Sequence, residues 1–526
     1  MATIEIDDIG RIGTVTDTPA YQLPPEIFTT AINMRVVDGG LEKSLGWSQI
    51  FGTPGVAPHF ALAVRTASAT FWLYVSLTKA YGYDGTTHTN ITRTSGGDYT
   101  ATDTYQWNGT LLGGVPIINN GIDVPQFWST VALATPLTAL TNWPSTLRAK
   151  ILRAFGPFLM AFNCTKSGTT YPHMVKWSHP AVPGSVPSSW DETDATKDTG
   201  EEDLADVNAG VLVEALPLSD TMFAYKEAST WKIRYVGGRA IFDVGKGAWL
   251  TTSGVLASRC ATVTGDGKRH VVATQDDIIW HDGNQVKSVL QGRQRKRLFN
   301  EIDTTNYGTS FIFDNPLAQE IWFCYPTSGA TQPNKALIMN YSTGDTWAIT
   351  EADGITFRNA IAGTIESPSE ETWDGTEDLW DDDTGPWAQL ARRRVVLCGT
   401  NATKFYNLDS GTTRDGTSFT GTIQRIGLSL LGRKRNGDWI VDFEQRKLGT
   451  RLWPKIQGGP VDVRFGAQEV VNGAVAWSPV ASYDPATEVF ADCDPVSGRA
   501  LALEVSSANS WRIDGYKYDV IALGKY

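Results

Sequence analysis

The sequence has few of the residues on which most metal and redox chemistry depends. Its 526 residues include only 6 His, 6 Met and 5 Cys. The cysteines show no C-x-x-C spacing, and their odd number argues against a disulfide framework or a structural zinc site. We therefore expect five small buried thiols in a reducing compartment. They are Cys164, Cys260, Cys324, Cys398 and Cys493.

Catalytic signatures are missing as well. The chain has no H-E-x-x-H, no G-x-S-x-G, no Walker A motif and no G-x-G-x-x-G between a strand and a helix. The six histidines show no ligand spacing, although His270 and His281 could meet across a sheet. This predicts a protein with no enzyme activity, no metal and no cofactor.

Positive charge and long apolar runs are also scarce. The 45 Lys and Arg against 57 Asp and Glu give a formal net charge of −12. An acidic chain is a poor candidate for wrapping DNA, which requires clustered Lys and Arg. The opening "MATIEIDDIGRIGTV" lacks the apolar core of a signal peptide, and no run approaches the roughly 18 apolar residues of a membrane helix. We expect the protein to be made and kept in the cytosol, or to leave by a route that its sequence does not encode.

Glycine and tryptophan, in contrast, are abundant, at 51 and 19 residues. Stretches such as "TFWLYVSLTKAYGYDG" (70–85) and "TMFAYKEASTWKIRYVGGRAIFDV" (221–244) alternate apolar and polar residues and break at Asp-Gly or Gly-Gly. Such dipeptides favour hairpin turns because they accept the positive φ that matches strand twist. Helical spacing is nearly absent; "STLRAKILRAF" (145–155) is either a turn of helix or the start of a strand.

The hairpin units recur every 45 to 65 residues, as their closing aromatic residues show. An irregular but persistent period of this kind is typical of a β-propeller with one antiparallel sheet per blade. We predict an all-β fold with a propeller of six or seven blades over residues 1–412, closed by the N-terminal strand "TAINMRVV" (30–37). The closing aromatics are Tyr83, Trp128, Trp177, Tyr235, His281, Tyr341 and Tyr406.

The pattern changes near residue 413. Longer alternating strands follow, such as "VDVRF", in which Val461, Val463 and Phe465 share one face. This pattern predicts a separate β-sandwich domain over residues 413–526.

One stretch, "DDIIWHDGNQVKSV" (276–289), packs Asp, Trp and His closely together. It could hold a metal or an acid/base pair, or it could be two strands and their turns. Neighbours on a strand point to opposite faces, so Trp280 and His281 would not share a site. The hairpin period favours the blade interpretation.

The most unusual segment is "ETWDGTEDLWDDDTGPW" (371–387), within an acidic insertion near 366–391. Trp373, Trp380 and Trp387 recur every seven residues, but Gly and Pro exclude a heptad helix. Three interpretations stay open: a solvated insertion anchored by its Trp residues, a loop that docks a partner, and a calcium loop.

Basic residues gather in three runs, "RQRKR" (293–297), "ARRRV" (391–395) and "GRKRNG" (432–437). Such runs are usually solvated turns. The functional alternative is contact with a neighbouring subunit or with phosphates. The residues in question are Arg293, Arg295, Lys296, Arg297, Arg392, Arg393 and Arg394.

Several stretches together resemble the propeller-bearing tail nozzle, or tail hub, proteins of short-tailed bacteriophages. The similarity begins with "LPPEIFTTAINMRVVDGGLEKSLGWSQIFG" (23–52) and continues in order through "VKWSHPAVPGSVPSSWD" and "LPLSDTMFAYKEASTWKIRYVGG". It extends through "DDIIWHDGNQVKSVLQGRQRKRLFNEID" (276–303) and "EIWFCYPTSG" to "SSANSWRIDGYKYDVIALGKY" (506–526).

The resemblance implies a virion protein in a sixfold ring below the portal and adaptor proteins. Such a ring forms a channel that retains packaged DNA and later releases it, and it carries tailspikes or fibres. The acidic balance suits a channel that must release DNA. The alternative is a carbohydrate-active propeller, either a glycoside hydrolase or a lectin, although no pair of carboxylates is identifiable as its catalytic pair.

Overall fold

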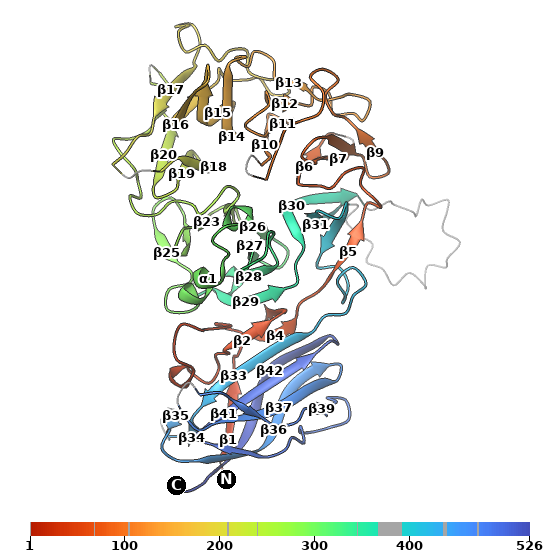
Figure 1. The fold of residues 1–526 in the computed structure, drawn as a ribbon, viewed down its shortest axis with the longest axis vertical. Helices are drawn as coiled ribbons and strands as arrows, with labels where there is room; N and C mark the ends of the chain where they lie inside the picture. The colour runs from red at the N-terminus through yellow and green to blue at the C-terminus, as the bar shows by residue number, and fades with distance from the viewer. Residues whose placement is uncertain are drawn as a thin grey trace, which may run out of the picture. The chain divides into compact units, whose positions relative to one another are not determined.

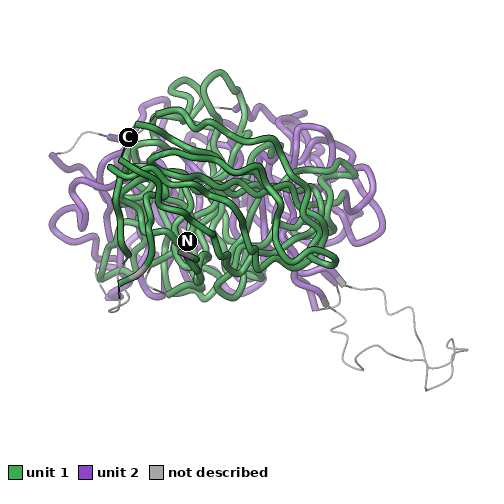
Figure 2. Tube along the Cα trace, turned by 90° about the horizontal axis from the view of Figure 1, so that it is seen from below, with its two compact units in different colours: residues 1–48, 259–356, 409–526 green, residues 49–258, 357–408 purple. Residues whose placement is uncertain are grey.

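The protein is all-β in a computed structural model that describes residues 2–525, except 68, 104–105, 208–209, 239, 345, 367–391, 435–438 and 471–472. Figure 1 shows the order of its strands. The chain divides into two compact units (Figure 2). Unit 1 comprises Met1–Ser48, Arg259–Thr356 and Asp409–Tyr526, and unit 2 comprises Gln49–Ser258 and Phe357–Leu408.

Unit 2 is built from antiparallel four-stranded sheets, the blades of the propeller. The first contains β6 (Phe60–Arg65), β7 (Thr70–Val75), β8 (Ala80–Tyr83) and β9 (His88–Asn90). The second contains β10 (Asn108–Leu112), β11 (Val115–Asn119), β12 (Gln126–Phe127) and β13 (Thr138–Ala139). The third contains β14 (Leu147–Phe155), β15 (Phe158–Lys166), β16 (Thr169–Trp177) and β17 (Gly200–Asp203). The fourth contains β18 (Leu212–Leu218), β19 (Thr221–Lys226), β20 (Thr230–Tyr235) and β21 (Phe242–Asp243).

The remaining blades follow the same order of strands. One contains β30 (Phe357–Glu366), β31 (Arg392–Thr400), β32 (Phe405–Leu408) and β5 (Trp47–Ile50). Unit 1 supplies β22 (Ala261–Val263), β23 (His270–Ala273), β24 (Ile278–His281) and β25 (Val286–Ser288). It also supplies β26 (Phe311–Asn315), β27 (Glu320–Tyr325), β28 (Lys335–Asn340) and β29 (Ala348–Asp353). The described residues therefore form seven four-stranded blades.

Blades within unit 2 pack through aliphatic and aromatic side chains. Ile117 of β11 and Leu152 of β14 belong to one buried cluster between the second and third blades. At Gly363 on β30, an added Cβ would lie 2.2 Å from Cη2 of Trp72 on β7, so only glycine allows these strands to approach so closely. Removing this apolar surface from water is the main favourable contribution to folding.

The sandwich belongs wholly to unit 1. One sheet is ordered β3 (Met34–Val37), β4 (Gly40–Lys43), β42 (Trp511–Ala522), β36 (Lys447–Gly458) and β40 (Val496–Gly498), with β1 (Ala2–Asp7) also paired to β42. The other contains β2 (Thr30–Ile32), β33 (Gly421–Leu428), β41 (Ala500–Ser507), β37 (Val461–Gln468), β38 (Ala476–Trp477) and β39 (Ala481–Tyr483). The ribbon of β34 (Leu430–Arg433) and β35 (Trp439–Val441) accompanies them. Phe465 and Tyr518 meet at 4.9 Å between ring centroids in the shared core.

A blade and the sandwich share one continuous sheet. Strand β2 pairs in parallel with β29 at Ile32↔Glu351 and antiparallel with β33 at Ala31↔Ile423. The ten-stranded sheet that results runs from the β26–β29 blade through β2 into β33, β41 and β37 (Figure 1). Backbone hydrogen bonds thus join the sandwich to this blade.

The propeller with a C-terminal sandwich is confirmed, but the expected domain boundaries are wrong at the N-terminus. Residues 30–37 do not close a blade: β2 joins β29 to β33, and β3 enters the sandwich. Strand β5, further along the chain, is the outer strand next to β32. Alternation identifies 30–37 as a half-buried strand but carries no information about its partner.

Three further expectations have clear outcomes. Residues 147–155 form a strand, β14, so the helical alternative for 145–155 is wrong. The basic run 293–297 leads into helix α1 (Arg295–Glu301) rather than forming only a turn. All five cysteines are buried, as expected. Short 3₁₀ helices occur at η1 (Ala20–Gln22), η2 (Tyr307–Thr309) and η3 (Tyr341–Thr343).

Candidate functional site

The Asp-Trp-His stretch 276–289 lies in the β22–β25 blade, which confirms the blade interpretation. His281 on β24 pairs with His270 on β23, and both side chains are buried, with ring centroids 5.1 Å apart. Trp280 lies on the other face, 6% exposed, with the Arg269 guanidinium 4.6 Å from its ring centroid. Asp282 accepts hydrogen bonds from backbone N–H groups of the next turn, which lower the pKa of its carboxyl. The residues of this stretch therefore form strands β24 and β25 and the turn between them.

The basic run that follows is largely occupied by contacts within the chain. The Arg293 guanidinium donates to the carbonyl of Trp347, and Arg295 pairs with Asp276. Arg297 Nη2 donates to Glu351 Oε2 at 2.8 Å. Burial acts to lower the pKa of Arg297, but the Glu351 carboxylate outweighs it and the pKa is raised. Lys296 is exposed at the surface of α1. Contact of this run with a subunit or with DNA stays a prediction.

The other predicted contact residues are only partly described. Arg393 and Arg394 are exposed on β31, where their backbones pair with Ile365 and Thr364 of β30. Arg392 begins the same strand. In the third basic run Lys434 is exposed, and residues 435–437 lie outside the described part.

The predicted Trp-Asp loop, residues 371–387, belongs to the segment 367–391 that the structure does not describe. Trp373, Trp380 and Trp387 all lie outside the described residues.

A buried charged group that the sequence reasoning missed lies where the segments of unit 1 meet. Arg35 on β3 donates through Nη2 to Glu320 Oε2 at 3.0 Å and to Asp409 Oδ2 at 2.9 Å. Its side chain is 10% exposed, and that of Glu320 on β27 is 1% exposed. Asn315 donates to the same Asp409 oxygen at 2.7 Å, and Trp322 Nε1 donates to Glu320 at 3.1 Å. Burial acts to lower the pKa of Arg35, but the two carboxylates outweigh it and the pKa is raised.

A second polar group lies in the same unit. Asn33 adopts a positive φ of 58° and donates through Nδ2 to Asp353 at 2.7 Å and to the carbonyl of Thr420 at 2.9 Å. Arg414 donates to the Asn33 side-chain oxygen at 2.6 Å and lies over the ring of Trp47 at 4.5 Å. Burial lowers the pKa of Arg414 to about 10. We call these two groups, centred on Arg35 and Asn33, the junction cluster.

The junction cluster joins all three segments of unit 1. Arg35 and Asn33 come from the first segment, Glu320 and Asp353 from the second, and Asp409 begins the third. Its partners lie hundreds of residues apart, so no local motif could have identified it. The one signal in the sequence was Asn33, a residue type that tolerates positive φ. Chemically, the cluster is a set of ion pairs and hydrogen bonds that connects the blade to the sandwich within unit 1.

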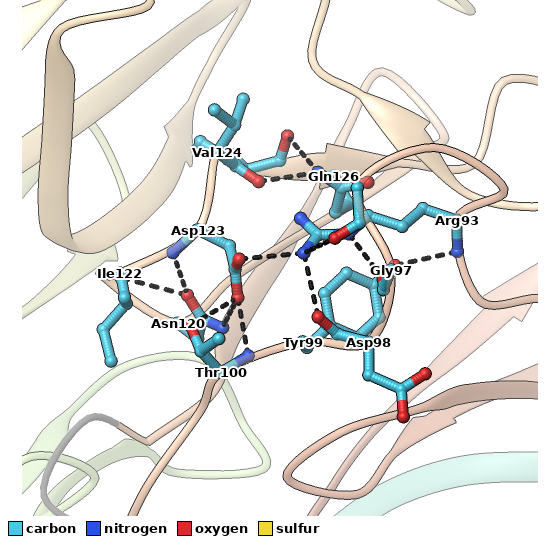
Figure 3. Close-up of polar contacts among 12 residues, drawn as sticks. Arg93, Gly97, Asp98, Tyr99, Thr100, Asn120, Ile122, Asp123, Val124 and Gln126 are labelled. Carbon is cyan, nitrogen blue, oxygen red and sulfur yellow. Dashed lines mark hydrogen bonds and ion pairs between the residues drawn. The ribbon is translucent and has the colours of Figure 1, made fainter.

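A comparable network in unit 2 joins the first two blades (Figure 3). Arg93, after β9, pairs with Asp123 at 3.0 Å and lies 4.7 Å from the ring centroid of Tyr99. Asp123 also accepts from the Thr100 backbone at 2.9 Å and from Asn120 Nδ2 at 2.8 Å. Burial acts to raise the pKa of Asp123, but these donors and Arg93 outweigh it and the pKa is lowered. The ionised carboxylate thus connects the loop after β9 to the loop between β11 and β12.

Within the described residues, no three His, Cys, Asp or Glu side chains come together as a candidate metal site. No helix in the same part of the chain has the length and apolar character needed to cross a membrane.

No protein-family model matches the chain, and no curated protein is similar to it. Solved structures with similar backbones include YCF48 bound to D1 peptide, at 12% identity and a TM-score of 0.36, covering 69% of this chain and 97% of that one. Another is the β-propeller domain of Swd1 from Myceliophteria thermophila, at 9% identity and a TM-score of 0.37, covering 69% and 99%. At these values the comparisons carry no conclusion about function, and the propeller rests on the sheets described above.

Proposed function

We propose that the protein is a structural component of the tail of a short-tailed bacteriophage. Copies assemble into a nozzle or hub ring, with six subunits, beneath the portal and adaptor proteins. The ring retains packaged DNA, lets double-stranded DNA of any sequence pass during ejection, and carries tailspikes or fibres outside. The protein is made in the cytoplasm of the bacterial host, becomes part of the virion, and acts without catalysis or a cofactor.

The observation that carries this proposal is the position of the resembling stretches in the fold. The stretch 23–52 contributes β2, β3 and β4, while 276–303 contributes β24, β25 and α1, and 506–526 contributes β42. All of these elements belong to unit 1. Within it β4 pairs with β42, and β2 joins the blade sheet to the sandwich. Motifs that are distant in sequence thus share sheets within unit 1, while two further resembling stretches, 175–191 and 216–238, lie in unit 2. The shared sheets support a resemblance of the fold rather than of isolated turns.

The distribution of charge also supports a conduit. The net charge is −12, and three of the four cations in the run 293–297 have partners within the chain. Tight non-specific DNA binding depends on many Lys and Arg free to pair with phosphates. A chain of this kind suits a channel that holds DNA by confinement and releases it quickly.

Electron microscopy of the purified full chain tests the proposal directly. We expect closed rings with a central channel in untreated samples. If charged contacts hold the subunits together, the rings should dissociate at high salt. A Lys268→Ala variant is a suitable control because this side chain is exposed and lies outside the three basic runs. A protein that stays monomeric at all concentrations and salt conditions would contradict the ring.

A further inference from the structure

An open groove of ≈ 350 Å³ lies in unit 1, where the N-terminal segment passes the sandwich. Its walls come from residues 15–21, the start of β2, strand β33, Phe443 after β35 and the end of β37. None of the described residues that line it is Asp, Glu, Lys or Arg. The proposed tail function assigns no role to this groove so far.

The wall that contains η1 is fixed firmly against β33. Arg425 on β33 is 1% exposed and donates through Nη1 to the Ala20 carbonyl at 3.0 Å and through Nη2 to the Leu23 carbonyl at 2.9 Å. Nearby, Gly427 has a positive φ of 73°, and an added Cβ would lie 2.9 Å from the Tyr21 backbone nitrogen. The groove is therefore formed before a partner binds, which reduces the entropy that binding costs.

The polar side chains of the groove are largely engaged within the chain. Thr29 Oγ1 donates to the Gln424 carbonyl at 3.0 Å, and the Gln468 amide donates to the Gly473 carbonyl at 2.6 Å. The Gln424 amide in turn donates to Glu504. Groups that are already paired offer little to orient a small polar ligand, because such ligands are held by a few free polar groups.

The part of the groove that is open to a partner is aromatic and aliphatic. The rings of Tyr21 and Phe443 meet edge to face with centroids 6.3 Å apart, and both are partly exposed. Val470, which also lines the groove, is 64% exposed. Aromatic side chains without charged neighbours are typical of the centre of a protein–protein interface. The groove therefore suits apolar side chains of a protein segment.

Unit 2 presents a surface of matching chemistry, which we call the apolar ridge. It consists of large apolar side chains, between 42% and 73% exposed, at turns of the second, third and fourth blades. The turns between β10 and β11, β16 and β17, and β20 and β21 leave the same end of these antiparallel blades. The residues of the ridge are Leu111, Val182, Tyr235 and Val236.

Contacts between neighbouring turns make the apolar ridge continuous. The Gly184 N–H donates to the Gly113 carbonyl at 2.8 Å, which joins the turns of the second and third blades. The Phe158 ring of the third blade lies 5.7 Å from that of Tyr235 in the fourth. The stretches 111–118 and 177–190 contain no Asp, Glu, Lys or Arg. The ridge is therefore both uncharged and fixed over its second and third blades.

A subunit of a cyclic ring needs two different surfaces that fit one another, because the contacts run head to tail. The groove and the apolar ridge are two such surfaces. Each copy carries a formal charge of −12, so copies repel where carboxylates face each other, and contact costs least where neither surface is charged. We propose that the apolar ridge of one copy, with Val182 at its centre, docks in the groove of the next copy. This inference rests on the proposed ring.

Site-directed cross-linking of the full chain tests the docking. The variants Val182→Cys and Val470→Cys are mixed, and one of them carries a tag that changes its mass. All five native cysteines are buried, so a short bismaleimide should react with the introduced thiols. We expect a cross-linked dimer of tagged and untagged chains in the mixture. Neither variant alone should give one, because in a head-to-tail contact position 182 meets position 470 of the next copy and not itself.

Val489→Cys is the matched control. Val489 is 73% exposed, as is Val182, and belongs neither to the groove nor to the apolar ridge. Mixed with Val470→Cys, it should give no cross-link. In a second measurement, Val182→Asp should raise the protein concentration at half-assembly at least about 10-fold, because docking would bury an unpaired charge. Val489→Asp should leave that concentration unchanged.

The outcomes separate the docking from the ring itself. Closed rings in electron micrographs without a cross-link between positions 182 and 470 would overturn the docking and leave the ring intact. Equal cross-linking by Val489→Cys would overturn the docking as well. A specific cross-link in open chains of subunits would support the docking and contradict the closed ring. A protein that stays monomeric under all conditions would overturn both.

Discussion

Arg35 and Asp409 lie 374 residues apart in the sequence, yet their side chains form an ion pair of 2.9 Å. The same guanidinium pairs with the buried Glu320 at 3.0 Å. Removing one partner of a buried ion pair is costly because the other charge is left without compensation, whereas replacing both by apolar groups is often tolerated. The pair is therefore a sensitive probe of how the segments of unit 1 are held together.

We expect Arg35→Met to destabilise the protein by about 3–5 kcal/mol, the typical cost of an uncompensated buried charge. The double variant Arg35→Met/Glu320→Leu should recover part of that loss. The measurement is chemical denaturation followed by tryptophan fluorescence. If the double variant were as unstable as the sum of the two single variants, the two side chains would not be coupled in stability.

Two variants in the run 293–297 compare a cation that is held in an ion pair with one that is exposed. Arg297→Ala leaves the buried Glu351 without its partner and should cost about 1–3 kcal/mol. Lys296→Ala should change stability by less than about 0.5 kcal/mol, as expected for an exposed position. Thermal denaturation of both variants checks this prediction. Equal stability of the two variants would show that the Arg297 pair contributes nothing to the fold.

Binding to duplex DNA tests the conduit proposal separately. The free protein should bind DNA more weakly than the roughly 10⁻⁴–10⁻⁶ M of non-specific DNA-binding proteins, and without preference for a sequence. Fluorescence anisotropy with two unrelated duplexes of equal length is the measurement. Sub-micromolar binding that discriminates between the duplexes would identify a DNA-recognition protein instead.

Trp280 should behave as a packing residue of its blade. It is 6% exposed and packs between Arg269 and Lys287, so Trp280→Ala should cost about 3–5 kcal/mol. Asp282→Asn keeps a side-chain oxygen that can accept from the following turn and should have a much smaller effect. The comparison is made by urea denaturation. A tolerated Trp280→Ala would argue against tight packing at this position.

Four charged side chains beside the third blade make the stability of the fold depend on acid pH: Lys166 and Lys176 each pair with both Glu192 and Glu201. The ordinary pKa of a glutamate side chain is 4.5. Burial acts to raise the pKa of Glu192, but hydrogen bonds from Lys176 and Lys166 outweigh burial and lower it to about 2. A carboxyl whose pKa is lower in the folded state stabilises the protein above its unfolded pKa and loses that effect as pH falls. The advantage of the wild type over Glu192→Gln should therefore be largest above about pH 5 and decline between pH 4.5 and 2. Melting curves across this range measure it, and a constant difference would mean that Glu192 is not held by the lysines.

The sequence by itself determined the type of secondary structure and the blade repeat. Alternation along 269–289 and the Asp-Gly turn at Asp282 predicted β23, β24 and β25, because strand periodicity and turn conformation depend on neighbouring residues. It also correctly predicted five buried cysteines and the change to longer strands in the sandwich. These features are local, so a single sequence can reveal them.

Only the tertiary structure decided which strands pair and which charges meet. Alternation in 30–37 indicated strands, but their partners turned out to be β29, β33 and β4 rather than a closing position in a blade. Likewise, nothing near Arg35 in the sequence indicated Glu320 or Asp409, and the run 293–297 gave no sign that Arg297 would pair with Glu351. A strand edge or a guanidinium accepts many partners with similar local energy. The choice among them comes from burying the most apolar surface while every buried charge finds a counter-charge, and that condition applies to the whole fold at once.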